Sequence, residues 1–314
     1  MHCVRTAAVI ALAFVVLAAG AGADAAATGD VAAATAAASP GQPNYQGLWW
    51  NAPAGSESGW GINFAHQGDT IFATWFTYDT SGKAAWFAMT AQKIGAETYG
   101  GKLYATRGPA FNAEPFDPKA VVATEVGTGT LSFSDADNGT FNYAIGAVNQ
   151  TKAITREVFG QLPTCTFGAA AATGDVDSNY QDMWWNSPAG SEPGWGIALS
   201  HSTPNWASTI VAVWLTYDLD GSSMWLIATG PYDNGMFNGY NGTLYRTSGA
   251  RFDAFDAHNV VTTAVGEMSL YGSWNDGNTR LFDYSVQLPG MASAVSGTKT
   301  LTRQIFVAPG TTCR

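Results

Sequence analysis

The peptide GLWWNAPAGSESGWGI spans residues 47–62, and a close copy, DMWWNSPAGSEPGWGI, spans residues 182–197. The copies are offset by 135 residues (182 − 47 = 135), and the offset grows to 139 at Trp75 and Trp214 (214 − 75 = 139). The additional residues fall in turn-like stretches, so both copies keep the same strands. An internal repeat of this kind predicts one fold that is built twice along the chain.

The repeat divides the chain into two units of ordinary domain size. We predict a first domain over residues 44–165, a linker over 166–178 and a second domain over 179–313. Residues 24–43 are rich in alanine and have almost no bulky apolar side chain to bury. We expect them to form a disordered spacer ahead of the first domain.

The first residues of the chain have the pattern of an export signal. Arg5 precedes the apolar run TAAVIALAFVVLAA (6–19), and Ala21-Gly22-Ala23 supplies the small residues of a cleavage site. A membrane anchor would need about 20 apolar residues, more than this run contains. We therefore expect residues 1–23 to be a cleaved signal peptide and the mature protein to be secreted or periplasmic, as in bacterial export.

Two cysteines, Cys165 and Cys313, remain after this cleavage, and each closes its own repeat. Export makes a disulfide between them chemically possible, but pairing also requires that their Cα atoms lie within about 7 Å of each other. The sequence alone leaves a bridge and two free thiols as equal alternatives.

The chain is acidic, with a formal net charge of −10 and a pI of about 4.7. A surface of this charge repels phosphate backbones and anionic lipid, so we expect neither a nucleic acid partner nor membrane insertion. Charged residues make up only 12% of the chain, whereas aromatic residues reach 13%. This mixture favours β-structure with tight turns over disorder.

Inside each repeat, short apolar runs alternate with turns rich in Gly, Asn and Asp. In the first repeat the predicted strands are 46–51, 59–66, 70–78, 84–92, 100–106, 121–134, 140–147 and 152–159. Loops this short join antiparallel neighbours, and a meander of about eight strands has no free edge once it closes. We therefore predict an all-β protein of two tandem antiparallel up-and-down β-barrels that pack together.

The alternation of side chains along the strands predicts which of them face inward. Trp75 and Thr77 share one face of the third predicted strand, and Trp86 and Thr90 share one face of the fourth. We expect both pairs to point into the barrel. Phe76 occupies the opposite face of the third strand, so the outside of that strand should be covered, and the other barrel is the natural cover.

The start of each repeat resembles a known family. Gly47-x-Trp49-x-Asn51, followed by a Gly-Ser pair at 55–56, resembles the first-strand signature of avidin and streptavidin. Those proteins are up-and-down β-barrels of similar length, so the resemblance implies the same architecture. This chain departs from their pattern by one additional residue before the Gly-Ser pair, and by Asp182 in place of Gly47 in the second repeat.

The last strand of each repeat adds to this resemblance, because it carries the sequence KAITR or KTLTR. In the wider calycin group, which includes the lipocalins, an arginine from a late strand packs on the first-strand tryptophan. The resemblance implies that Arg156 packs on Trp49, and that Arg303 packs on Trp184. The GLWWN…SGWGIN…ATWFTYD repeats also resemble a group of secreted bacterial proteins, a similarity that implies no activity.

The duplicated Trp, Thr and Asn residues favour a binding function, because aromatic rings edged by hydroxyl and amide groups suit sugars and small apolar metabolites. The candidate ligand-binding residues are Asn51, Ser56, Glu57, Trp60, His66, Trp75, Thr77, Trp86 and Thr90 in the first repeat, and Asn186, Ser191, Glu192, Trp195, His201, Trp214, Thr216, Trp225 and Thr229 in the second. We predict an exported, non-catalytic protein that holds a small or oligomeric ligand in each barrel interior or at its mouth. The alternative is that the tryptophans only fill the barrel core.

A structural or adhesive role is a second possibility. Phe76 and Tyr78 of the first repeat, and Leu215 and Tyr217 of the second, lie on outer strand faces. If these side chains formed an exposed apolar patch, they would bind a protein partner.

An enzyme is a third possibility, since Glu57, His66 and Asp79 recur in the second repeat and would supply a weak hydrolase with acid and base groups. The chain has no H-E-x-x-H and no G-x-S-x-G motif. Only His66, His201 and His258 follow the signal peptide, too few histidines for a metal centre in each repeat. We expect neither a metal nor a cofactor.

Overall fold

A computed structural model describes residues 43–169, 179–202, 207–233, 239–272 and 277–314. The predicted signal peptide, nearly all of the spacer and most of the linker lie outside the described residues.

The first repeat forms a closed antiparallel barrel, in which each strand pairs with its neighbour in sequence and the first strand pairs with the last. Its strands are β1 (Gly47–Asn51), β2 (Gly61–Gln67), β3 (Thr70–Tyr78), β4 (Ala84–Gly95), β5 (Thr98–Arg107), β6 (Val122–Phe133), β7 (Asn138–Ile145) and β8 (Val148–Arg156). Closure pairs Trp49 with Arg156. We call this unit barrel 1.

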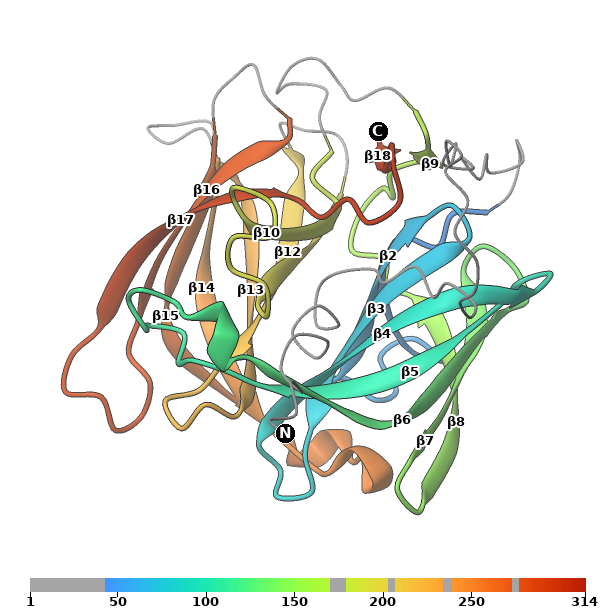
Figure 1. Cartoon of the computed structure of the whole chain (residues 1–314), viewed down its shortest axis with the longest axis horizontal. Coiled ribbons are helices and arrows are strands. Elements are labelled where there is room, and N and C mark those ends of the chain that lie inside the picture. The colour runs from blue at the N-terminus through green and yellow to red at the C-terminus, as the bar shows by residue number, and fades with distance from the viewer. Residues whose placement is uncertain (1–42, 170–178, 203–206, 234–238, 273–276) are drawn as a thin grey trace, which may run out of the picture.

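The second repeat forms a second closed barrel with the same strand order. Its strands are β10 (Asp182–Asn186), β11 (Gly196–His201), β12 (Thr209–Tyr217), β13 (Ser223–Asp233), β14 (Gly239–Ser248), β15 (Val261–Tyr271), β16 (Thr279–Val286) and β17 (Val295–Arg303). We call it barrel 2. The prediction of two tandem eight-stranded antiparallel barrels is confirmed, and Figure 1 shows them side by side.

The predicted strand bounds agree with the structure to within a few residues for the first six strands. The last two were placed two to four residues too late, because the β7–β8 turn falls at Gly146-Ala147 and not after it. Gly146 has φ +57°, a conformation that glycine adopts without strain. A two-residue turn of this kind joins Ile145 directly to Val148, which pair across the hairpin.

Barrel 1 has an aromatic core that includes Trp75, as the alternation predicted for that residue. Trp60 and Phe64 of one strand face, with Trp75 of the next strand, belong to a single buried cluster. A buried aromatic side chain removes about 150–250 Å² from water, which is worth roughly 4–6 kcal/mol before entropy costs. The cation–π contacts implied by the family resemblance are present: the Arg156 guanidinium lies 4.9 Å from the Trp49 ring.

The two barrels pack through the outer faces of their central strands. The Trp86 indole donates to the Thr216 carbonyl oxygen at 3.0 Å, and the Trp225 indole donates to the Thr77 carbonyl oxygen at 2.9 Å. Phe76 is buried in the same apolar cluster as Trp225, so the other barrel covers it as expected.

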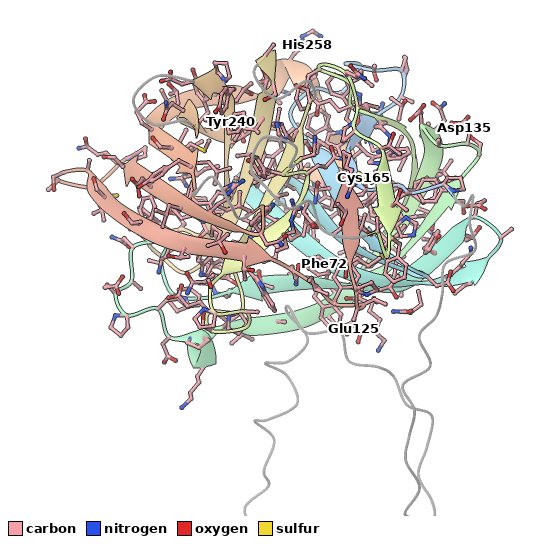
Figure 2. The ribbon with its side chains drawn as sticks, turned by 90° about the horizontal axis from the view of Figure 1, so that it is seen from above. Phe72, Glu125, Asp135, Cys165, Tyr240 and His258 are labelled. Carbon is pink, nitrogen blue, oxygen red and sulfur yellow. A yellow bond between two sulfur atoms is a disulfide. The ribbon has the colours of Figure 1, made fainter. Side chains whose placement is uncertain are left out.

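A small two-stranded sheet outside the barrels joins the ends of the repeats. It pairs β9 (Cys165–Phe167) with β18 (Thr311–Cys313), and a disulfide links Cys165 to Cys313. The structure thus resolves the choice between a bridge and free thiols. Figure 1 shows the two short strands together, and Figure 2 labels Cys165.

Two glutamines next to this sheet bind each repeat to the other. Gln46 Nε2 donates to the Gln181 carbonyl oxygen at 2.9 Å, and Gln181 Nε2 donates to the Gln46 carbonyl oxygen at 3.0 Å. The two hydrogen bonds are reciprocal, which indicates an approximate two-fold relation between the barrels.

Candidate functional site

One end of each barrel, which we call its mouth, carries the β1–β2 loop or the equivalent β10–β11 loop. At mouth 1, Glu57 Oε2 accepts hydrogen bonds from Trp60 Nε1 and from Lys152 Nζ, both at 2.8 Å. Lys152 Nζ also lies 5.7 Å from the centre of the Trp60 ring. The side chains of Lys152 and Glu57 are only 17% and 25% exposed, so this ion pair is better shielded than a surface pair.

Mouth 2 repeats this arrangement. Glu192 Oε2 accepts from Trp195 Nε1 and from Lys299 Nζ, both at 3.0 Å. Lys299 Nζ lies 5.8 Å from the centre of the Trp195 ring. We call each Glu–Trp–Lys group a mouth triad. The glutamates and tryptophans were predicted site residues, whereas the lysines were missed, although their recurrence in KAITR and KTLTR was visible in the sequence.

The predicted Asn and Ser residues lie beside the triads and stabilise the loops. Asn51 Nδ2 donates to Ser56 Oγ at 2.9 Å, and Asn186 Nδ2 donates to Ser191 Oγ at 3.0 Å. These hydrogen bonds close the loop within one repeat, and both are exposed. Each Asn–Ser pair therefore forms part of the rim of its own mouth.

A loop from the second repeat covers mouth 1. This loop contains the short 3-10 helices η4 (Phe252–Ala254) and η5 (Ala257–Asn259). The Phe252 ring packs on Trp75 with ring centres 5.6 Å apart, and on Tyr143 at 6.0 Å. The Tyr143 hydroxyl donates to the Phe252 carbonyl oxygen at 3.2 Å. Phe252 thus acts as a plug that the other repeat supplies.

The first repeat makes the equivalent contact with mouth 2. Phe111, in the loop between β5 and β6, lies 5.9 Å from Trp214 and 6.4 Å from Tyr284, ring centre to ring centre. In Figure 1 the loop with η2 (Pro118–Ala120) reaches barrel 2, and η4 and η5 lie at the end of barrel 1.

The exchange of loops explains a glycine in each copy of the repeated peptide. A Cβ atom on Gly59 would lie 2.6 Å from Val260, and one on Gly194 would lie 2.6 Å from Val121. Both distances are shorter than carbon atoms allow. Each glycine therefore admits a valine from the loop of the other repeat.

Trp75 and Trp214 lie beneath the plugs and are each 3% exposed. Within the described residues neither indole N–H has a hydrogen-bond partner, although buried indoles usually find one. Neighbouring rings pack closely on them, with Tyr143 at 4.6 Å from Trp75 and Tyr284 at 4.8 Å from Trp214. The two barrels therefore place the same unpaired donor at the same position.

The histidines occupy the opposite end of each barrel. His66 Nδ1 accepts from the Tyr45 backbone N–H at 3.0 Å, and its Nε2 lies 3.3 Å from the Tyr99 hydroxyl. Burial lowers the pKa of His66 to about 4, and that of His201 to about 3. Both rings are neutral near pH 7 and serve as hydrogen-bonded core residues.

Glu57 and His66 therefore do not meet. Strand β2 separates them, and its seven residues extend over about 20 Å at ~3.3 Å per residue. Asp79 holds a turn, since its Oδ1 accepts from the Ser81 and Lys83 backbone N–H groups. The three groups of the hydrolase hypothesis share no common site.

The structure reverses the predicted direction of Trp86 and Thr90, which we expected to face the interior of barrel 1. Trp75 pairs with Phe87 and Phe76 pairs with Trp86, so Phe87 faces inward and Trp86 faces outward with Thr90. The prediction that Trp86 and Thr90 line the interior is wrong, because the fourth strand is apolar on both faces and alternation alone did not identify the inner one.

The same correction applies to barrel 2. Trp225 lies between the barrels, and Thr229, four residues further along the same strand face, is exposed. Thr77 and Thr216 share the inner face with Trp75 and Trp214 and are buried, as predicted.

The outer aromatic faces are also occupied. Phe76, Tyr78, Leu215 and Tyr217 are each at most 4% exposed, because the other barrel or its loop covers them. A partner protein would reach these side chains only if the barrels separated.

Comparisons with protein-family models, with curated proteins and with solved structures return no match. The fold and the site define the chain as a tandem β-barrel protein in which each repeat plugs the mouth of the other. In the described parts of the chain, no helix is long and apolar enough to cross a bilayer, and no three His, Cys, Asp or Glu side chains gather in a way that would hold a metal ion.

Proposed function

We propose that this protein is an exported, non-catalytic binding protein with two equivalent ligand sites, one at each barrel mouth. The observation that carries the proposal is the pair of buried, unpaired indole N–H groups of Trp75 and Trp214. Burial of an indole N–H without an acceptor costs free energy, and the cost occurs at the equivalent position of both barrels. A ligand that supplies a hydrogen-bond acceptor to each indole would offset it.

The surroundings of the two indoles favour a sugar as the ligand. Aromatic rings surround Trp75 and would offer faces on which a sugar can stack, and the Tyr143 ring lies 4.6 Å from Trp75, centre to centre. At the rim, Glu57 offers an acceptor and Lys152 offers a donor. The pair has no net charge, so it favours a neutral polyhydroxyl compound over a charged one.

The plugs belong to this binding mechanism. Phe252 contacts Trp75 directly, so a ligand that reaches the Trp75 indole has to displace the Phe252 ring. Phe111 has the same relation to Trp214. Each site thus opens only when a loop of the other repeat moves.

A non-catalytic role is supported by the chemistry of the triads. Glu57 accepts hydrogen bonds from both Trp60 and Lys152, so its carboxylate is already engaged within the triad. His66, the histidine of that repeat, lies at the other end of the barrel.

Calorimetric titration with a panel of neutral mono- and disaccharides tests the proposal. We expect a ligand that binds at two sites per chain, and at least tenfold weaker binding when Trp75→Phe and Trp214→Phe are combined, because Phe keeps the ring and loses the donor. Trp50→Phe with Trp185→Phe is the matched control, since those indole N–H groups are also buried and unpaired but belong to outward-facing side chains. Unchanged affinity in the Trp75/Trp214 variant would overturn the proposal.

A further inference from the structure

Mouth 1 holds its plug by the backbone as well as by the ring. We call the Phe252 loop plug 1 and the Phe111 loop plug 2. The Tyr143 hydroxyl donates to the Phe252 carbonyl oxygen at 3.2 Å, and Gln150 Nε2 donates to the Asp253 carbonyl oxygen at 2.7 Å. The Tyr143 hydroxyl also lies 2.5 Å from Gln150 Oε1, which fixes the two side chains relative to each other. Barrel 1 thus presents two linked donors to two successive carbonyl groups of plug 1.

The tip of plug 1 is also braced within its own loop. The Arg251 guanidinium forms an ion pair with the Asp253 carboxylate, in which Arg251 Nη2 donates to Asp253 Oδ2 at 2.7 Å. Asp253 is therefore held through its side chain by Arg251 and through its carbonyl oxygen by Gln150. The backbone that presents the Phe252 ring is thus fixed on both sides of that residue.

Mouth 2 has no equivalent of the two donors. Tyr143 pairs with Gln150 across β7 and β8, and Tyr284 pairs with Gly297 in the same register across β16 and β17. A Cβ atom on Gly297 would lie 2.5 Å from the Tyr284 hydroxyl oxygen, so this hydroxyl lies over the backbone of β17 and leaves no room for a side chain there. Within the described residues, neither Tyr284 nor Gly297 donates a hydrogen bond to plug 2.

Plug 2 holds its phenylalanine less firmly. Alanine and asparagine flank Phe111, in place of the arginine and aspartate that flank Phe252, and the loop 108–121 is two residues longer than the loop 249–260. The Phe111 backbone N–H donates to the Tyr217 carbonyl oxygen at 3.0 Å. Plug 1 is therefore held by two hydrogen bonds and a braced tip, whereas plug 2 is held by one hydrogen bond.

We propose that Tyr143 and Gln150 form a latch that keeps mouth 1 closed, so that mouth 2 opens more readily and binds ligand more tightly. This inference rests on the proposed function for its ligand, because it concerns the regulation of the same two sites. The affinity of a site falls in proportion to the fraction of time for which it is open. One additional intramolecular hydrogen bond changes such an opening equilibrium by roughly twofold to tenfold, and we expect the two mouths to differ in affinity by about this factor.

Hydrogen–deuterium exchange of the full chain, followed by mass spectrometry of its peptides, measures the opening of each plug without a ligand. After correction for intrinsic exchange rates, we expect residues 108–116 to be less protected than residues 249–257. Gln150→Leu keeps the size of the side chain and removes its donor, so exchange over 249–257 should rise roughly threefold to tenfold, with 108–116 unchanged. Tyr143→Phe removes the other donor and should have the same effect.

Asn149→Leu is the matched control for these variants, because Asn149 is exposed on the opposite face of β8. It should leave the exchange of both plugs as it is in the parent protein. Unchanged exchange over 249–257 in both latch variants, or an equal rise in Asn149→Leu, would overturn the proposal. Stronger protection of plug 2 than of plug 1 in the parent protein would overturn it as well.

Calorimetric titration with the neutral saccharides, glucose and maltose included, connects the latch to binding. We expect two affinities per chain, of which Trp214→Phe weakens the tighter and Trp75→Phe the weaker. Gln150→Leu should strengthen the weaker site alone, roughly threefold to tenfold. If Trp75→Phe weakens the tighter site instead, the order of the mouths is wrong and the proposed function stands. If no saccharide binds, the affinity order fails together with the proposed function, whereas the exchange experiment still decides whether the latch exists.

Discussion

At the scale of single residues, buried polar groups carry most of the specific chemistry of this protein. Arg156 is the clearest case, because it stacks on Trp49 and also donates to the carbonyl oxygens of Gln46 and Asn44. Arg303 stacks on Trp184 and pairs with the buried Asp182. Arg156 therefore links the last strand of barrel 1 to the segment just before its first strand. Arg303 links the last strand of barrel 2 to the first residue of its first strand.

The buried histidines predict a loss of stability in acid. The folded-state pKa of His66 is about 4, below its ordinary value of 6.5, because burial and the nearby Lys93 and Arg156 cations disfavour its charge. A group whose pKa is depressed by folding contributes its stability above pH 6.5, and this contribution is lost as the pH falls from 6.5 to 4. The loss for His66 is about 3 kcal/mol.

Urea unfolding at a series of pH values between 7 and 4 measures this effect. The combined variant His66→Gln and His201→Gln should have a smaller free energy of unfolding at pH 7 and a clearly shallower decline towards pH 4. His258→Gln is the control, since His258 lies on the exposed loop helix η5. An equal slope in the variant and the parent protein would show that other groups cause the acid sensitivity.

At the scale of elements, the two long loops are the least expected part of the structure. Each leaves its own barrel and ends on the mouth of the other, where one phenylalanine packs among the aromatic side chains. Gln150 Nε2 also donates to the Asp253 carbonyl oxygen at 2.7 Å, so mouth 1 binds both the ring and the backbone of its plug. In barrel 2 the residue equivalent to Gln150 is Gly297, so that contact has no counterpart.

Removal of one plug should open one mouth. We expect Phe252→Ala to lower the free energy of unfolding by about 3 kcal/mol, the usual cost of losing a buried aromatic ring. Because Trp75 lies under Phe252, the fraction of tryptophan fluorescence that acrylamide quenches should rise.

Two variants control this experiment. Phe111→Ala should give the same two changes through Trp214, and Val261→Ala should give neither, because Val261 is 58% exposed. Quenching unchanged in Phe252→Ala would mean that other residues shield Trp75.

At the scale of the whole molecule, the repeats are held together by contacts that occur in reciprocal pairs. The indoles of Trp86 and Trp225, the amides of Gln46 and Gln181 and the two plugs each cross from one repeat to the other. The disulfide adds a covalent link between sequence positions 148 residues apart. The two barrels therefore form one structural unit, and we expect them to unfold together.

Reduction of the disulfide should lower the free energy of unfolding of the two barrels, which should still unfold as one unit. A cross-link that closes a loop of this length contributes about 5 kcal/mol in the chain-entropy description. We expect Cys165→Ser with Cys313→Ser to lower the urea midpoint and to retain a single transition. The parent protein in a reducing agent should match the variant, and two separate transitions would show that the barrels are independent.

Local pattern was sufficient to predict the repeat, the antiparallel meander and the inward face of the third strand, which holds Trp75 and Thr77. These features depend on alternation and turn chemistry within a few residues. Two of the three residues of each mouth triad could be predicted from the sequence, because Glu57 and Trp60 are close along the chain. Lys152 was missed because it meets them only when the barrel closes.

The remaining features were decided by tertiary structure alone. Alternation distinguishes the two faces of a strand but does not say which face is the inside when both are apolar, so the direction of Trp86 depended on the other barrel. The destinations of Phe111 and Phe252, and the pairing of Cys165 with Cys313, join residues that are distant along the chain. No local preference encodes such contacts, because they form only after two closed barrels meet.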